Sequence, residues 1–107
     1  MGQAGKYLRT FGYGNKEGYK NGVGYSHYCP GCELLHGFAV SEPFSNGAKW
    51  TFNGDLEKPS FSPSMNIGPN WCHYYLTNGM LIFSASKGHS LTGKTVPLPE
   101  LPPEYRD

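Results

Sequence analysis

The sequence has little charge, few cysteines and no long apolar run. Charged residues make up 16% of the 107 positions and the formal net charge is +1, which excludes a strongly electrostatic partner for the chain as a whole. No run approaches the roughly 18 apolar residues that a membrane-spanning helix needs. The N-terminus also lacks the apolar core of a signal peptide. We therefore expect no membrane association and a cytoplasmic location.

Helical periodicity is nearly absent as well, whereas turn-forming and aromatic residues are plentiful. There are 15 glycines and 9 prolines, and aromatic residues make up 15% of the chain. Short apolar runs bounded by Gly, Asn, Pro and Ser are typical of strands. The chain is therefore predicted to be a single all-β or β-dominated domain over residues 1–107, an antiparallel sheet with hairpins. A domain this small often needs a disulfide or a bound metal ion in addition to its apolar core.

The predicted strands cover residues 6–11, 23–29, 34–40, 48–53, 71–77, 80–86 and 94–98. Residues 12–22 are expected to form a flexible loop, 57–69 an extended connector and 96–107 a proline-rich strap. Asn78-Gly79 between two apolar runs favours a two-residue type I′ hairpin turn. That turn pairs Tyr74 with Phe83, and it places Cys72 inward and His73 on the opposite face.

Cys29-Pro30-Gly31-Cys32 is the sharpest motif in the sequence. Three cysteines cannot all pair, and without an export signal their thiols are expected to stay reduced. Two thiolates at C-x-x-C spacing suit one tetrahedral zinc ion, so we expect a zinc knuckle. A redox pair would need a helix after its first cysteine, where a strand is predicted. Two unlinked buried cysteines are the other alternative.

Two further ligands are needed to complete such a site. Cys72 is the first choice. His89 is the second, because it comes shortly after the second strand of the predicted hairpin and a short turn could bring it back beside Cys72. His36, four residues after Cys32, and His73 are rivals. Neither an H-E-x-x-H helix nor a deaminase motif is present, which favours a structural zinc over a catalytic one. The expected metal ligands are Cys29, Cys32, Cys72 and His89, with His36 and His73 as rivals.

Other chemistry-bearing residues have ordinary structural explanations. Ser60, Ser62 and Ser64 surround Pro63 and are suited either to binding an anion or to capping a loop. No Ser/His/Asp order is recognisable, so no catalytic residue is assigned. Tyrosines alternate with basic residues near the N-terminus, which resembles a single-strand nucleic-acid surface, although a two-sided sheet gives the same pattern.

Several sequence blocks also occur in a recognisable order between Tyr25 and Leu101. They are CPGC at 29–32, WTFNG at 50–54, PSFSPS at 59–64, CH at 72–73, NG at 78–79 and HSLTGKTVPLP at 89–99. This order resembles a small family of phage, prophage and bacterial proteins, some of them labelled ammonia monooxygenase. The resemblance implies a zinc-binding phage-type protein with metal candidates at Cys29, Cys32, Cys72 and His89. Residues 85–89 (ASKGH) lack an acid that the family often has there, which disfavours an enzyme.

The leading functional hypothesis is therefore a phage or prophage accessory protein that binds zinc. It would act in the cytoplasm of the host cell by binding a host protein or a small anionic ligand such as a nucleotide, with nucleic acid a weaker candidate. The first alternative is a small zinc-dependent hydrolase of nucleotides or amides, using an open zinc position and His36 or His73 as acid/base. The second is a structural component of a virion. The oligomeric state is left open.

Overall fold

The computed structural model describes residues 3–13, 22–44, 46–67, 72–84 and 91–106. Most of the expected loop 12–22 lies outside these residues, as do Trp71 and the ligand candidate His89. Among the described residues, none belongs to a helix long and apolar enough to cross a membrane.

Two antiparallel sheets form the domain, which confirms the predicted β class. The first sheet has the order β1-β2-β3-β4, and the second has the order β5-β6-β7-β8-β9. The first comprises β1 (Gln3–Ala4), β2 (Leu8–Tyr13), β3 (Gly22–Cys29) and β4 (Leu34–Ala39). The second comprises β5 (Thr51–Phe52), β6 (Phe61–Ile67), β7 (Cys72–Thr77), β8 (Met80–Phe83) and β9 (Thr95–Pro97).

The hairpin between β7 and β8 has the predicted register. Tyr74 pairs with Phe83 and Thr77 with Met80. Asn78 and Gly79 both have positive φ angles, 50° and 74°, as a type I′ turn requires. Alternate residues of β7 are buried, so Cys72 and Tyr74 face the interior while His73 faces the other way.

Strand β6 was not predicted, because its prolines favoured an extended connector. It pairs with β7 at both ends, with an irregular register between Phe61 and Met65. Pro63 lies inside this irregularity, where a missing backbone N–H costs no ladder hydrogen bond. The irregular stretch also contains Ser64.

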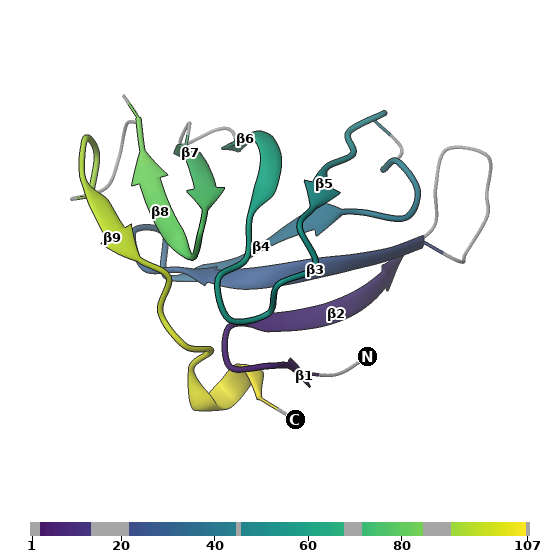
Figure 1. The fold of residues 1–107 in the computed structure, drawn as a ribbon, viewed down its shortest axis with the longest axis horizontal. Coiled ribbons are helices and arrows are strands. Elements are labelled where there is room, and N and C mark those ends of the chain that lie inside the picture. Colours follow the sequence, from purple (N-terminus) through teal and green to yellow (C-terminus); the bar gives the residue numbers. More distant parts are fainter. Residues whose placement is uncertain (1–2, 14–21, 45, 68–71, 85–90, 107) are drawn as a thin grey trace.

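An aromatic stack fills the space between the two sheets. Phe38 of β4 lies parallel to Phe61 of β6, with ring centroids 4.3 Å apart, and Phe52 of β5 stacks on Phe61 at 4.7 Å. Trp50 meets Phe38 edge-on at 5.3 Å. In Figure 1 the sheets lie one above the other, and the C-terminal segment passes below β1 and β2.

The C-terminal segment is held to the first sheet by hydrogen bonds. Leu101 N–H donates to the carbonyl of Lys6, and Arg9 donates to the carbonyl of Tyr105. Leu101 itself is fully buried. The segment contains β9 and a short 3-10 helix, η1 (Pro103–Tyr105), so it is more regular than the predicted strap.

Candidate functional site

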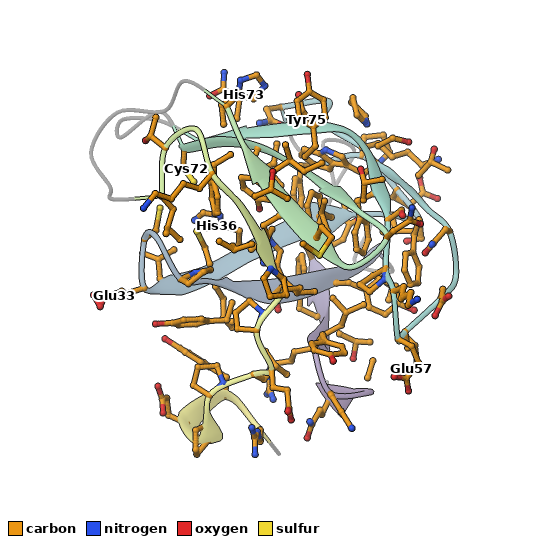
Figure 2. All side chains as sticks on the ribbon, turned by 60° about the vertical axis from the view of Figure 1, so that its left-hand side comes forward. Glu33, His36, Glu57, Cys72, His73 and Tyr75 are labelled. Atoms are coloured by element: carbon orange, nitrogen blue, oxygen red, sulfur yellow. The ribbon has the colours of Figure 1, made fainter. Side chains whose placement is uncertain are left out.

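A cluster of three cysteines and one histidine lies where the two sheets meet. Cys29 ends β3, Cys32 lies in the following turn, His36 is on β4 and Cys72 begins β7. One ligand atom from each lies within 4.8 Å of all the others, in the set Cys29, Cys32, His36 and Cys72. Figure 2 shows His36 and Cys72 side by side between the sheets, with His73 on the outer surface beyond β7.

The dimensions of this cluster fit a tetrahedral metal site. The sulfurs of Cys29 and Cys72 are 3.9 Å apart, and all three cysteines are free thiols. Two thiolates at about 2.3 Å from one tetrahedral zinc ion are separated by about 3.8 Å. Cys29, Cys72 and His36 are buried. The cluster can therefore hold a metal ion with four protein side chains.

Hydrogen bonds within the cluster already favour a thiolate at one position. The sulfurs of Cys29 and Cys72 share a hydrogen bond, and this contact lowers the pKa of Cys29 to about 6. The same contact, together with burial, raises the pKa of Cys72. The backbone N–H of Cys32 also donates to the sulfur of Cys29, at 3.4 Å. Cys29 is therefore the cysteine of the cluster whose surroundings favour the thiolate.

Behind the cluster, a buried hydrogen-bonded chain orients His36. Its Nδ1 lies 3.2 Å from the hydroxyl of Tyr74, which leaves Nε2 as the metal-binding atom. The same hydroxyl lies 2.6 Å from Nε2 of His27. Burial, with a smaller contribution from His36, lowers the pKa of His27 to about 3, so His27 is neutral, and in the tautomer with an unprotonated Nε2 it accepts the Tyr74 proton. Tyr74 is then free to accept the Nδ1 proton of His36, an arrangement typical of metal-bound histidines.

A second polar cluster lies on the outer face of the β6–β8 sheet. The ring of His73 on β7 is held between two serine hydroxyls. Its Nε2 lies 2.9 Å from Oγ of Ser64, and its Nδ1 lies 2.8 Å from Oγ of Ser84. All three side chains are half-buried. Ser64 follows Pro63 in the irregular part of β6, and Ser84 comes directly after β8.

The hydrogen bonds of Ser84 determine the tautomer of His73. The hydroxyl of Ser84 donates to the backbone carbonyl of His73 at 3.1 Å, so its oxygen accepts the proton on Nδ1. The unprotonated Nε2 therefore points at the hydroxyl of Ser64. A serine hydroxyl within hydrogen-bond reach of an oriented histidine is the arrangement of an activated nucleophile.

Ser64 also borders a pocket of about 440 Å³. Aromatic and small residues of the segment before β5 form one wall, and Ser64 and Asn66 of β6 form another. The indole N–H of Trp50 donates to the backbone carbonyl of Ser64 at 3.3 Å, which fixes one wall against the other. The hydroxyl that contacts His73 therefore belongs to a residue on the wall of a pocket large enough for a ligand.

A family model described as bacterial ubiquitination-like system serine protease (BubE) matches residues 9–84. The chain belongs to this family. The match covers more than two thirds of the 107 residues and includes both polar clusters of the BubE-family domain. No curated protein and no solved structure matches the chain.

The site differs from the sequence-based expectation in its histidines. His36 lies with Cys29, Cys32 and Cys72, whereas His73 lies on the far side of β7 and contacts the serines. His89, the expected fourth ligand, is outside the described residues. It also lies beyond the residues matched by the BubE model.

Sequence reasoning missed the pairing of Ser64 with His73 in this BubE-family chain. The sequence has no recognisable Ser/His/Asp order, and among the described residues the hydrogen bonds from the His73 ring to Ser64 and Ser84 involve no acid. Ser60 does cap a loop, since its hydroxyl accepts from the N–H of Asn78 at 2.8 Å, but Ser64 does not. A usable signal was the expectation that His73 faces away from Cys72, because this places it on a different face from the cysteine cluster.

Proposed function

We propose that this chain is a serine peptidase of a bacterial ubiquitination-like system, with Ser64 as nucleophile and His73 as general base. The observation that carries the proposal is the His73 ring, bonded to two hydroxyls at 2.9 and 2.8 Å, one of which belongs to the pocket-lining Ser64. The description of the family as a serine protease supports the same chemistry.

The hydrogen-bonded chain supports a conventional acyl-transfer sequence. Oγ of Ser64 attacks the scissile carbonyl carbon while its proton moves to Nε2 of His73. His73 then gives this proton to the leaving amine nitrogen as the C–N bond breaks, which leaves an acyl ester on Ser64. Water, deprotonated by the same nitrogen, then attacks the ester carbonyl; the ester C–O bond breaks, the proton on Nε2 returns to Oγ of Ser64, and the acid is released.

Ser84 takes the place that a carboxylate occupies in the common triad. It holds the correct tautomer of His73, but it brings no negative charge to stabilise the imidazolium formed during the reaction. In the contacts of the described residues, hydrogen bonds with serine hydroxyls orient the base. We accordingly expect a slow peptidase compared with enzymes that carry an Asp at this position.

We further propose that the Cys–His cluster holds zinc in a structural role. Three thiolates and one imidazole form a closed donor set of the kind found in structural zinc sites. The cluster joins β3 and its turn to β4 and β7, so the ion would fasten the two sheets together. Reduced thiols of this kind suit a cytoplasmic location.

Hydrolysis of a labelled, unfolded casein by the purified, zinc-loaded chain tests the peptidase. We expect slow cleavage that Ser64→Ala abolishes. Ser62→Ala is the matched control, because Ser62 lies two residues away, is exposed and should leave the rate unchanged. Cleavage that survives Ser64→Ala in a chain of unchanged circular dichroism would contradict the assignment.

The zinc-hydrolase alternative makes a different forecast for the same variants. In that alternative the reaction takes place at an open zinc position near His36. Ser64 is then not needed, and activity should survive Ser64→Ala. The four-side-chain donor set supports a closed site instead. The role of a phage accessory protein that binds a host partner stays a second hypothesis, supported by motif resemblance alone.

A further inference from the structure

The outer edge of β4 carries backbone groups that no other strand uses. β4 is the last strand of its sheet, and the N–H of Trp50 donates from the open side to the carbonyl of Ala39 at 2.8 Å. Because N–H and C=O groups alternate in direction along an antiparallel strand, Gly37 and Leu35 also turn theirs to this side. In the described part of the chain, neither residue has a backbone hydrogen bond outside the β3–β4 ladder.

The pocket beside Ser64 opens directly onto this free edge. Its wall includes Gly37 of β4 as well as Ser64 of β6, so a residue of the free β4 edge and the residue of the proposed nucleophile line the same pocket. Phe44, Ala48 and Trp50 supply an apolar side to the pocket. None of the described residues that line it carries a charge, which disfavours an anionic ligand such as a nucleotide there.

We propose that the substrate is an extended polypeptide segment that binds as an additional strand along β4, with one apolar side chain in the pocket. This inference rests on the proposed peptidase function. A row of unpaired N–H and C=O groups is complemented by another extended backbone, as in β-strand addition. Trp50 already begins this extra line of hydrogen bonds at Ala39, and the substrate continues it past Gly37.

The pocket dimensions agree with this occupant. A volume of about 440 Å³ is typical of sites for small ligands, and it is far too small for a folded domain. An unfolded tail or an exposed linker can enter, whereas the interior of a folded protein cannot. An apolar side chain seated against Phe44 and Trp50 would occupy the same pocket that Ser64 lines.

Binding of capped alanine hexapeptides with one central leucine tests the inference without requiring catalysis. The protein is the full-length, zinc-loaded Ser64→Ala chain, and calorimetry measures affinity. Each backbone nitrogen of the peptide is methylated in turn. Removing one backbone hydrogen bond should weaken binding about 5-fold, so we expect losses at alternate positions and little change at those between.

Two substitutions probe the pocket in the same assay. Leucine to aspartate in the peptide, or Ala48→Phe in the protein, should reduce affinity at least 10-fold, with the unfolding temperature of the protein unchanged. Equal losses at every methylated position would overturn the inference. Tighter binding of ATP than of any peptide, or an Ala48→Phe variant that binds leucine peptides normally, would also overturn it.

The outcome for this inference is separable from the outcome for the peptidase. Alternating losses in Ser64→Ala, together with a wild-type chain that cleaves nothing, would support strand addition and refute hydrolysis. Cleavage by the wild-type chain, together with equal losses at every position, would support hydrolysis and refute strand addition.

Discussion

Replacing Ser84 by alanine removes the hydroxyl that makes two hydrogen bonds to His73, one to the ring and one to the backbone. The contact that orients the ring is the 2.8 Å bond from Nδ1 of His73 to the Ser84 hydroxyl, and the 3.1 Å bond from this hydroxyl to the His73 carbonyl is lost with it. The backbone N–H of Ser84 still donates to the carbonyl of His73 at 3.0 Å, so pairing at the end of β8 should survive. The variant therefore isolates the orientation of the base from the integrity of the fold.

The expected loss in rate is small for a residue in a catalytic chain. A hydrogen bond between neutral groups contributes about 0.5–1.5 kcal/mol net, and about 1.4 kcal/mol corresponds to a factor of ten in rate. We therefore expect kcat/KM of Ser84→Ala to fall about 2- to 13-fold. Replacing the carboxylate of a common triad costs about 10⁴-fold, because both charge and tautomer are lost.

Initial rates of peptide cleavage measure this difference, with Ser64→Ala as the zero-activity reference. Circular dichroism should show that Ser84→Ala is folded. An unchanged rate would refute the orienting role of Ser84. A fall of about 10⁴-fold in kcat/KM of a folded variant would also refute the reasoning, because the loss of a neutral hydrogen bond to the ring is too small to cause it.

The other predictions concern the metal site and the aromatic stack between the sheets. Cys29→Ser, or treatment with a strong chelator, should unfold the domain, because metal binding and folding then form one equilibrium; a folded, metal-free chain by circular dichroism would contradict this. Tyr74→Phe should weaken zinc binding about 10- to 100-fold by freeing His36 to rotate, as measured by competition with a zinc indicator. Phe38→Ala removes the ring that stacks on Phe61 and meets Trp50 edge-on, and it should lower the free energy of unfolding by about 3–5 kcal/mol, measured by urea denaturation of the metal-loaded protein.

Local sequence signals sufficed for the fold class and for part of the metal cluster. Asn78-Gly79 determines its own turn through its positive φ angles, so the hairpin register follows from two residues. The C-x-x-C spacing likewise brings Cys29 and Cys32 together within one turn. Alternation along β7 then places Cys72 inward.

Long-range packing determines the features that local sequence signals do not indicate, namely strand β6 and the second polar cluster. β6 pairs with β7 despite Pro63, because the irregular register tolerates the missing N–H. That irregularity brings Ser64 to His73, nine residues away in sequence. No spacing rule links Ser64, His73 and Ser84, since their contact depends on the order of β6, β7 and β8 in the sheet.

Covalent labelling with a fluorophosphonate tests the central claim most directly, because this reagent phosphonylates a nucleophilic serine as fluoride leaves. Peptide mass spectrometry of the zinc-loaded chain should find one adduct, on Ser64. The adduct should persist in Ser62→Ala and be absent from Ser64→Ala and His73→Gln. A folded, zinc-loaded chain that gains no adduct, or an adduct that remains in Ser64→Ala, would contradict the account.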